Sequence, residues 1–206
     1  MNRARIAVFV SGGGTNLQAL IDAQAAGTLH SGEIALVVSS SPDAYALERA
    51  RRAGIPTAVC PRRELGSQEA FETALHRALA RHAIHLIVLA GFLSILSEEF
   101  VSWWPGRILN VHPSLIPSFC GKGMYGLKVH EAALARGVKV TGATVHLVNE
   151  IPDGGPILLQ KAVKVLPEDT PETLQKRVME QAEWVLLPQA AEMVSARIAE
   201  EKEKES

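Results

Sequence analysis

Short apolar runs separated by helical patterns dominate the first half of this chain and restrict its fold most. The first run, Ile-Ala-Val-Phe-Val at residues 6–10, is apolar throughout, and further strand-like segments lie at residues 34–38, 86–90 and 107–111. Strands with apolar side chains on both faces are typical of a parallel sheet that helices cover on both sides. The alternation predicts an α/β fold whose first half, residues 1–113, is a Rossmann-like, doubly wound mononucleotide-binding unit in a mainly parallel twisted sheet.

Amphipathic segments fill the intervals between these strands. In the first of them Leu17, Leu20 and Ile21 recur at helical spacing, and Gly27 follows as a stop signal. The pattern predicts helices at residues 15–26, 43–53 and 67–82, with a short third strand at residues 56–59. Helices between strands are the crossover connections that a parallel sheet requires.

The composition changes after Pro113. A loop rich in Gly, Pro and Ser, a short helix, two alternating strands and a long helix are expected at residues 114–126, 127–135, 140–148, 156–165 and 171–199. We expect the last helix to be interrupted near Pro188 and the charged residues 200–206 to form a frayed tail. Because no linker separates the halves, the sequence predicts one domain over residues 1–199, whose C-terminal half, residues 114–199, combines antiparallel strands with a long helix.

Charge and cysteine content exclude several classes of protein. The 21 Lys and Arg residues against 22 Asp and Glu residues give a net charge of −1, which disfavours a nucleic-acid-binding protein because such proteins need a basic surface. The most apolar window, residues 84–96, is too short and too polar to span a membrane. Cys60 and Cys120 fit neither a zinc site nor a disulfide framework, and His82 and His85 lack a third ligand. We therefore expect a cytoplasmic protein without a metal.

The sequence Ser-Gly-Gly-Gly-Thr-Asn at residues 11–16 joins the first strand to the first helix. Glycines at this position let backbone N–H groups approach a ligand, and the helix N-terminus favours an anion. The segment is not a Walker loop, because no lysine follows the glycines, and Leu17 replaces the third glycine of the dinucleotide fingerprint. We interpret it as a phosphate-binding loop in which Thr15 and Asn16 add hydrogen bonds. The alternative is a tight turn with Thr15 as the helix N-cap.

Asn110 and His112 form the second candidate site. Residues two apart in a strand share a face, and Pro113 is expected to end the strand directly after this pair. Open α/β sheets bind their ligands at this carboxyl end of the strands. A carboxamide beside an imidazole suits reactions at a carbonyl, since the amide donates to an oxyanion and the imidazole moves a proton. The alternative is a pair of polar side chains that are merely hydrogen-bonded at a strand end.

Asp153 lies in the glycine-rich segment Ile-Pro-Asp-Gly-Gly-Pro at residues 151–156. Such a run predicts a turn before anything else. If the turn faces the strand ends, however, the carboxylate of Asp153 can pair with the imidazole of His112 and keep that ring charged. The sequence thus leaves both a structural and a chemical interpretation of Asp153.

Five motifs follow one another along the chain: S-G-G-G-T-N, G-F-L-S-I-L-S, L-N-V-H-P-S-L-I-P, T-G-A-T-V-H and D-G-G-P. Together they resemble the folate-dependent formyltransferases over nearly the whole length. The glycine loop and the short chain narrow the resemblance to the glycinamide ribonucleotide formyltransferases of purine biosynthesis. Transfer RNA formyltransferases share the L-N-V-H-P-S run but carry a second C-terminal domain, for which no residues remain here.

This resemblance implies direct transfer of the formyl group of 10-formyltetrahydrofolate to the amine of glycinamide ribonucleotide. Both partners are small molecules, no metal takes part, and the protein would be a monomer or a weak homodimer. The catalytic residues would be Asn110, His112 and Asp153. The ribonucleotide would contact Gly14, Thr15 and Asn16 through its phosphate, with Glu180, Gln181, Ala182 and Glu183 nearby and Glu183 on the ribose hydroxyls. The folate would contact Gln68, Leu93, Ser94, Ile95, Leu96, Asn110, Asn149, Glu150, Ile151, Pro152 and Asp153.

Two positions depart from the commonest pattern of the family. Ser94 stands where an arginine is frequent, and Gln68 stands where an arginine can meet the folate tail. Arg62 and Arg63 are near enough in sequence to substitute for it. The loop at residues 118–126 is longer than in many relatives, so that it either reshapes access of the substrates or is a neutral insertion.

Helical periodicity and the resemblance disagree at Glu183. Leu174, Val178 and Val185 form one predicted core face, and Glu183 lies on the opposite, solvent side, whereas the resemblance places it on a substrate. Three other functions remain as alternatives: a formyltransferase for another amine, a formyl-tetrahydrofolate hydrolase, and a non-catalytic nucleotide-binding module.

Overall fold

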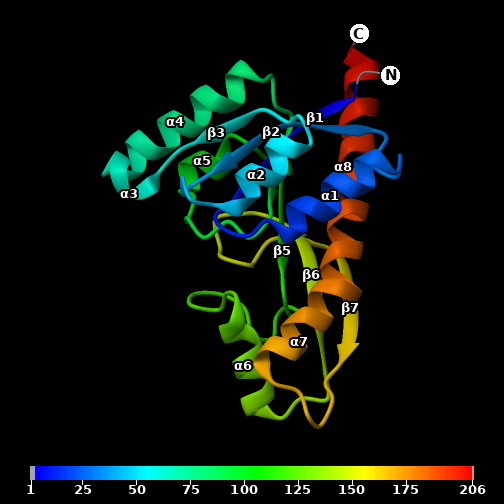
Figure 1. Ribbon diagram of the computed structural model, residues 1–206. Helices are drawn as coiled ribbons and strands as arrows, with labels where there is room; N and C mark the ends of the chain where they lie inside the picture. The colour runs from blue at the N-terminus through cyan, green and yellow to red at the C-terminus, as the bar shows by residue number, and fades with distance from the viewer. Residues whose placement is uncertain (1–2, 206) are drawn as a thin grey trace.

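The computed structural model describes residues 3–205 and has a seven-stranded sheet at its centre (Figure 1). In chain order the strands are β1 (Ala4–Val10), β2 (Gly32–Ser39), β3 (Thr57–Val59), β4 (Leu86–Leu89), β5 (Ile108–His112), β6 (Val140–Leu147) and β7 (Ile157–Lys164). Their spatial order is β3-β2-β1-β4-β5-β6-β7. β1 to β5 pair in parallel, whereas β6 is antiparallel to β5 and to β7. The predicted α/β fold, with a parallel first half and antiparallel strands later, is confirmed.

Helices connect most of the strands. They are α1 (Thr15–Ala25), α2 (Tyr45–Arg52), α3 (Arg62–Leu65), α4 (Gln68–Arg81), α5 (Glu98–Ser102), α6 (Leu127–Arg136), α7 (Pro171–Val178), the π-helical turn η1 (Met179–Glu183) and α8 (Trp184–Glu205). The predicted helices correspond to α1, α2, α4 and α6, with small differences at their ends. The sequence did not predict α3 or α5, because four or five residues are too few to show helical periodicity.

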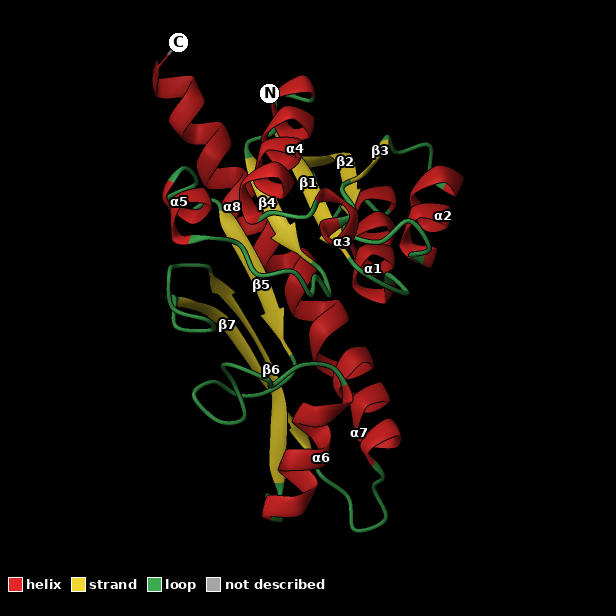
Figure 2. Ribbon diagram, turned by 90° about the vertical axis from the view of Figure 1, so that its left-hand side faces the viewer, coloured by secondary structure: helices red, strands yellow, loops and turns green. Residues whose placement is uncertain are grey.

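Side chains of β1 alternate between two hydrophobic cores, one on each face of the sheet. Ile6, Val8 and Val10 lie in the core that α1, α2, α7 and α8 cover, while Ala7 and Phe9 lie in the core that α4 and α5 cover (Figure 2). All five are fully buried. Burying a large apolar side chain contributes about 1.5–3 kcal/mol, which explains why a strand covered on both faces is apolar at every position.

The winding of the sheet reverses next to β1. The chain proceeds from β1 to β2 and β3 on one side, then crosses back to β4 and β5 on the other. The loops that follow β1 and β4 separate at this point, and open α/β sheets bind ligands in the crevice between such loops. A hydrogen bond of 2.9 Å from the backbone N–H of Leu93 to Ser11 Oγ joins the two loops. The topology therefore brings the glycine loop and the segment after β4 to one edge.

The long C-terminal helical segment is interrupted by η1 and not at Pro188. The predicted break near Pro188 is wrong, because α8 continues through that residue. Pro188 is the fifth residue of α8, directly after a turn that already departs from the α-helical hydrogen-bonding pattern. A proline there interrupts less than it would in the middle of a regular helix.

The end of α8 also differs from the prediction, since residues 200–205 are helical and not a frayed tail. Lys202 Nζ lies 2.7 Å from His85 Nε2, and Arg107 pairs with Glu201 at 3.1 Å. His85 and Arg107 come just before β4 and β5, far away in the sequence. These long-range contacts, which a local charge pattern does not reveal, attach the last turns to the sheet. Residue 206 lies outside the described residues.

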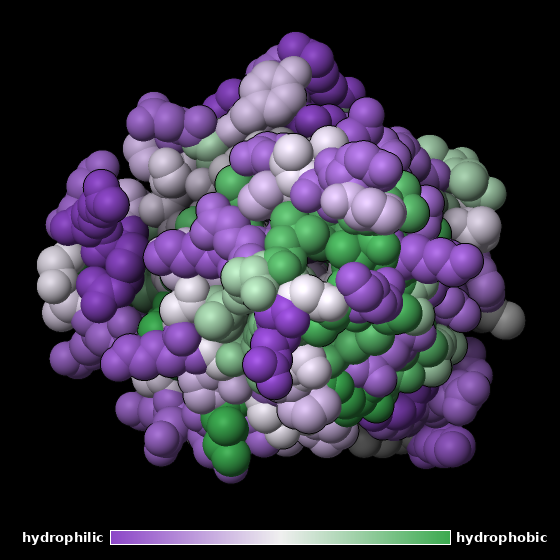
Figure 3. All heavy atoms as spheres, turned by 90° about the horizontal axis from the view of Figure 1, so that it is seen from below, coloured by the Kyte–Doolittle hydropathy of each residue, from purple (hydrophilic) through white to green (hydrophobic). Residues whose placement is uncertain are grey.

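The molecule is elongated, with β1 to β4 at one end and α6 and α7 at the other (Figure 1). Seen from the end that carries α6 and α7, hydrophilic residues cover most of the surface and apolar residues gather near the centre (Figure 3). Of the helices within residues 3–205, none is both long and apolar enough to cross a membrane.

Candidate active site

Asn110 and His112 are the third and fifth residues of β5, and their side chains lie on the same side of the strand, as predicted. In the ladder with β6, Asn110 is opposite His146 and His112 is opposite Thr144. β5 ends at His112, as expected before Pro113. His112 is buried and Asn110 is half-buried, so that both side chains are at least partly shielded from water.

Asp153 reaches this pair from the turn between β6 and β7. Its carboxylate lies 3.4 Å from Asn110 Nδ2 and 3.6 Å from His112 Nδ1, and it accepts a hydrogen bond of 2.8 Å from the Gly121 N–H. Burial alone would raise the pKa of Asp153. The hydrogen bonds from His146 and Gly121 and the charges of the two histidines outweigh burial and lower that pKa below its usual 3.8. The three predicted residues are therefore in contact, and the carboxylate of Asp153 is ionised at neutral pH.

The two ring nitrogens of His112 both face acceptors. Nδ1 faces the Asp153 carboxylate at 3.6 Å, and Nε2 lies 2.8 Å from the backbone carbonyl of Phe119. The ring of His112 is thus held between the carboxylate of Asp153 and the carbonyl oxygen of Phe119. Phe119 and Gly121 belong to the loop predicted at residues 114–126, which closes over the three side chains.

His146 is a further member of this cluster that the sequence analysis missed. It is buried, and its Nδ1 lies 2.9 Å from the backbone carbonyl of Leu147. Its Nε2 lies 3.1 Å from Asn110 Nδ2 and 3.5 Å from Asp153 Oδ1. His146 thereby orients the carboxamide of Asn110. The sequence feature that could have pointed to His146 is its position at the end of the T-G-A-T-V-H motif. To use this feature, one would have to know that β6, which carries the motif, pairs with β5.

The glycine loop is open on the side where a phosphate would approach. No described atom lies within 4 Å of a Cβ built on Gly12 or Gly13. Gly14 has φ of +73°, and a Cβ there would lie 2.6 Å from the Cβ of Ala46, so that packing against α2 requires a glycine. Gly14 is also the N-cap of α1, without a side-chain cap among the described residues. The alternative with Thr15 as N-cap is therefore wrong, and the first N–H groups of α1 are available to an anion.

Asn16 and Glu183 form a buried pair next to this loop. Asn16 Nδ2 donates to Glu183 Oε2 at 2.7 Å, while Asn16 Oδ1 has no partner among the described residues. Burial raises the pKa of Glu183 to about 7, and the hydrogen bond from Asn16 offsets only part of this effect. Of its predicted neighbours, Ala182 is buried and Glu180 and Gln181 are exposed.

Periodicity alone failed for this segment. Glu183 was predicted in solvent but is 6% exposed, and Val185 was predicted in the core but is 46% exposed. Leu174 and Val178, which precede η1, are buried as predicted. A π-helical turn contains more residues than an α-helical one, so that it rotates the positions after it relative to those before it. This rotation brings Glu183 to the inner face.

The two segments predicted to line a folate pocket lie after β4 and β6. The large apolar side chains of Leu93, Ile95 and Ile151 are 63%, 77% and 58% exposed. Gln68 connects α4 to the first segment, since its Nε2 donates to the Ile95 carbonyl at 3.0 Å and its Oε1 accepts from Arg62 Nε at 3.2 Å. Arg62 is thus next to the position where the resemblance expects an arginine.

The remaining predicted residues occupy the same two loops. Ser94, Leu96 and Asn149 are half-buried, while Glu150 and Pro152 are exposed. Within residues 3–205, no group of three or more His, Cys, Asp or Glu residues is arranged so that it could hold a metal ion. A cavity of about 790 Å³ lies elsewhere, between α1 and α8, and has Thr15 in its wall. The candidate site is therefore identified by its polar groups and not by that cavity.

A model of the formyl transferase family matches residues 4–190 of the chain. The chain belongs to the formyl transferase family. The match to the family includes β1 to β7, the glycine loop, Asn110, His112 and Asp153. It ends within α8, so that the last part of that helix lies beyond it.

Individual members of the family are similar over most of this chain. It is 46% identical over 195 residues to the trifunctional purine biosynthetic protein adenosine-3 of Gallus gallus, covering 95% of this chain. It is 42% identical over 184 residues to the phosphoribosylglycinamide formyltransferase of Haemophilus influenzae, covering 89% of this chain and 84% of that one. The chain spans only 14–19% of the trifunctional animal proteins that it matches.

A solved structure of the family has the same fold. The phosphoribosylglycinamide formyltransferase of Brucella melitensis superimposes with a TM-score of 0.86 at 45% identity, covering 95% of this chain and 97% of that one.

Proposed function

We propose that this formyl transferase moves the formyl group of 10-formyltetrahydrofolate to the amine of glycinamide ribonucleotide, a step of purine biosynthesis. Relatives named phosphoribosylglycinamide formyltransferase support this choice of acceptor. The observation that carries the proposal is the contact of the Asp153 carboxylate with Asn110, His112 and His146 at the ligand-binding edge of the sheet. A carboxamide, an imidazole and a carboxylate in contact suit transfer at a carbonyl carbon.

In the proposed reaction the amine attacks the formyl carbon, and the formyl oxygen becomes an oxyanion. Asn110 Nδ2 and the imidazolium of His112 donate to this oxygen. The His112 Nε2–H now donates to the neutral carbonyl of Phe119 at 2.8 Å, and Asn110 contacts Asp153 at the longer distance of 3.4 Å. An oxyanion is a stronger acceptor than a neutral carbonyl, so it can replace these contacts.

The second half of the reaction expels the folate. The bond between the formyl carbon and the folate nitrogen breaks, and the electron pair returns to that nitrogen, which takes up a proton. The imidazolium of His112 gives its proton to the folate nitrogen, and the neutral ring then takes up the proton that the attacking amine loses. Asp153 stays ionised because its own pKa is low, and it orients the ring and stabilises its charged form. The products are tetrahydrofolate and the formylated ribonucleotide.

The two substrates approach from opposite loops in this proposal. The phosphate of the ribonucleotide binds the N–H groups of Gly14, Thr15 and Asn16, and Glu183 accepts hydrogen bonds from its ribose hydroxyls. The exposed apolar side chains of Leu93 and Ile95 suit the flat ring of the folate. The hydrogen bond between the loops that carry these two groups supports a shared crevice.

Steady-state kinetics of Asn110→Ala and His112→Ala test the proposal. Removing one oxyanion donor typically lowers the rate about 100- to 1000-fold, so we expect kcat to fall at least this far while circular dichroism shows normal folding. His82→Ala is the matched control, since His82 lies at the end of α4 and outside the site. Near-normal turnover of either site variant contradicts the role of that residue.

The acceptor is tested separately with a panel of amines. We expect loss of the formyl group from 10-formyltetrahydrofolate only when glycinamide ribonucleotide is present. Release of formate without an amine indicates a hydrolase, and transfer to a different amine indicates another formyltransferase. Calorimetric binding of a dinucleotide without any turnover indicates a nucleotide-binding module. Each of these three results contradicts the proposed acceptor.

A further inference from the structure

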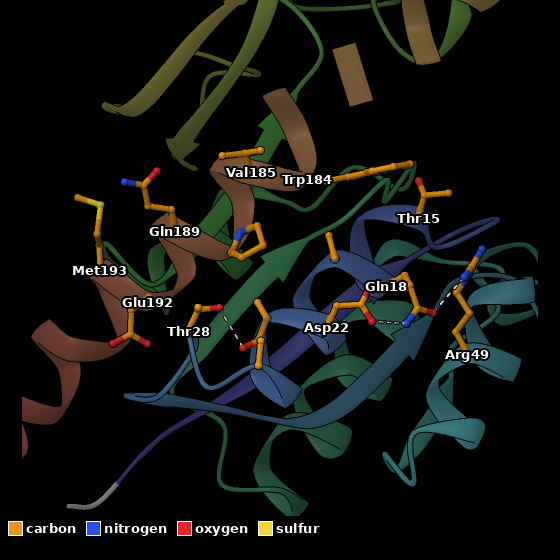
Figure 4. A pocket seen from close by; sticks show the side chains of 14 residues that line it. Thr15, Gln18, Asp22, Thr28, Arg49, Trp184, Val185, Gln189, Glu192 and Met193 are labelled. Atoms are coloured by element: carbon orange, nitrogen blue, oxygen red, sulfur yellow. Dashed lines mark hydrogen bonds between the residues drawn. The ribbon is translucent and has the colours of Figure 1, made fainter. Parts of the chain in front are cut away.

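Arg49 of α2 is a charged residue beside the glycine loop that has no part in the proposed reaction. It lies in the wall of the cavity between α1 and α8, where its side chain points toward Gln18 of α1 (Figure 4). Its Nε donates a hydrogen bond of 2.8 Å to the backbone carbonyl of Gly13, and its guanidinium donates one of 3.0 Å to Gln18 Oε1. Arg49 thus joins both helices to the loop between β1 and α1.

The carbonyl groups of the three glycines in this loop are all hydrogen-bonded. Backbone N–H groups of α2 and α1 donate to the carbonyls of Gly12 and Gly14, at 3.0 and 2.9 Å respectively. The carbonyl of Gly13, between them, accepts from a side chain, that of Arg49. A substitution of Arg49 can therefore remove this one bond without changing the backbone of either helix.

The carbonyl of Gly13 belongs to the same peptide unit as the N–H of Gly14. In a trans peptide the C=O and the N–H point in opposite directions, and among the described residues only the bond between Ile116 and Pro117 is cis. Because the Gly13 carbonyl points toward Arg49, the Gly14 N–H points away from it. This N–H has no acceptor among the described residues, and it is one of those that bind the phosphate in the proposed function.

Steric contacts alone do not fix the direction of this N–H. A peptide unit turns through ψ of the residue before it and φ of the residue after it, and here both residues are glycines, which have the widest range of backbone angles. No described atom lies within 4 Å of a Cβ built on Gly13, so the space around the loop leaves room for such a turn. The hydrogen bond from Arg49 opposes it.

The side chain of Arg49 is itself restrained. Gln18 Nε2 donates to Asp22 Oδ1 at 2.9 Å, which directs the oxygen of the Gln18 amide toward Arg49 (Figure 4). The guanidinium carbon lies 5.2 Å from the centroid of the Tyr45 ring, a cation–π contact. A side chain that is already ordered loses less conformational entropy when it holds a backbone group.

We propose that Arg49 is a positioning residue for phosphate binding. It keeps the peptide between Gly13 and Gly14 turned so that the Gly14 N–H faces the phosphate. This role rests on the proposed binding of the ribonucleotide phosphate at the glycine loop, and the ligand it favours is a phosphate group. Arg49 acts through the peptide unit and not by touching the phosphate, so its contribution depends on the Nε–H donor and not on the positive charge.

Two neutral variants separate the hydrogen bond from the charge. In Arg49→Gln the amide nitrogen is as many bonds from the Cα atom as the Nε of arginine, so it can still donate to the Gly13 carbonyl. Arg49→Met has an apolar group in that place. Arg52→Met is the matched control for loss of charge, because Arg52 is exposed on the same helix and approaches the same Tyr45 ring, at 6.0 Å.

Titration with inorganic phosphate measures the role of Arg49 directly. Proton–nitrogen correlation NMR follows the amide signals of the glycine loop, and we expect phosphate to shift that of Gly14. Arg49→Met should weaken phosphate binding about tenfold, the effect of losing one hydrogen bond to a charged group. Arg49→Gln and Arg52→Met should each bind within about threefold of the unmodified chain.

Three results of this titration overturn the proposal. The first is a Gly14 signal that phosphate does not shift. The second is phosphate binding by Arg49→Met that is as tight as that of the unmodified chain. The third is equal weakening by Arg49→Met and Arg49→Gln, which would show that the charge acts and the hydrogen bond does not. Circular dichroism of each variant verifies that the fold is retained.

Steady-state kinetics provide a second readout. We expect Arg49→Met to raise the KM for the ribonucleotide about tenfold and to change kcat less than about threefold, since binding of a phosphate remote from the reacting amine is lost. Arg49→Gln should restore the KM to within about threefold. A fall in kcat with an unchanged KM overturns the proposal. Because the phosphate titration needs neither substrate, weakened phosphate binding in Arg49→Met supports the role of Arg49 even if the ribonucleotide is not turned over, a result that would contradict only the proposed acceptor.

Discussion

Glu183 provides the sharpest test of the structure, because its carboxyl group is buried and its only described hydrogen-bond partner is the amide of Asn16. Burial raises the pKa of Glu183 from 4.5 to about 7. The folded protein thus holds a proton that the unfolded chain releases between these two pH values. Since the folded state binds more protons, this group makes stability fall as the pH rises from 4.5 to about 7.

The size of this effect follows from the shift in pKa. Moving the pKa of Glu183 from 4.5 to about 7 corresponds to about 3 kcal/mol, at about 1.4 kcal/mol for each pH unit. Glu183→Gln has nearly the same shape, still accepts from Asn16 and does not titrate. We therefore expect the variant to gain about 3 kcal/mol relative to the unmodified chain between pH 4.5 and pH 8, or about 6–12 °C in Tm.

Urea unfolding of both proteins at pH 4.5 and pH 8 measures this difference. Comparing the two pH values removes any constant effect of the substitution on packing. Glu180→Gln is the matched control, because Glu180 lies in the same π-helical turn but is exposed, and it should change stability by less than about 0.5 kcal/mol at either pH. If Glu183→Gln and the unmodified chain differ equally at both pH values, the carboxyl group is not buried as described.

Three further predictions concern other parts of the molecule. His146→Ala should lower kcat about tenfold or more by releasing the carboxamide that the ring orients, with little change in KM, as steady-state kinetics will show. Gly155→Ala should cost at least about 2 kcal/mol in urea unfolding, because its Cβ would lie 1.8 Å from the Leu147 carbonyl oxygen, whereas Gly12→Ala, with open space around it, should cost little. Burial and neighbouring cations lower the pKa of His85 to about 4. The free energy of unfolding should therefore be highest above pH 6.5, where His85 is neutral in both states, and fall as the pH decreases toward 4. His85→Gln should flatten this part of the dependence of unfolding free energy on pH.

The parts of the site that the sequence predicted are those that local geometry determines. Asn110 and His112 share a face because a strand repeats every two residues, and Pro113 ends the strand where a parallel sheet exposes its ligand-binding edge. The glycine loop lies between a strand and a helix for an equally local reason. For Asp153, however, the residues alone left open a simple turn, and only the fold places its carboxylate beside the imidazole.

The parts that the sequence did not predict depend on contacts between distant segments. His146 belongs to the cluster only because β6 pairs with β5 in one particular register. The backbone groups of Phe119 and Gly121 that hold His112 and Asp153 have no side-chain signature at all. A chain folds to satisfy such backbone donors and acceptors, but which loop does so is decided by the tertiary structure.

The π-helical turn η1 is a part of the structure that the sequence did not predict and that bears on function. It rotates Glu183, which periodicity places in solvent, toward Asn16 beside the glycine loop. There the buried carboxyl group lowers the free energy of unfolding by about 3 kcal/mol at neutral pH. Asn16 Oδ1, on the same pair, has no described partner. The Asn16–Glu183 pair thus lowers stability and leaves a buried polar atom without a hydrogen bond. Such features concentrate at functional sites, so we expect a ligand to supply the missing hydrogen bond. Glu183→Gln should therefore have opposite effects, raising stability at pH 8 while raising the KM for the ribonucleotide. A gain in stability with an unchanged KM would show that the pair is only structural.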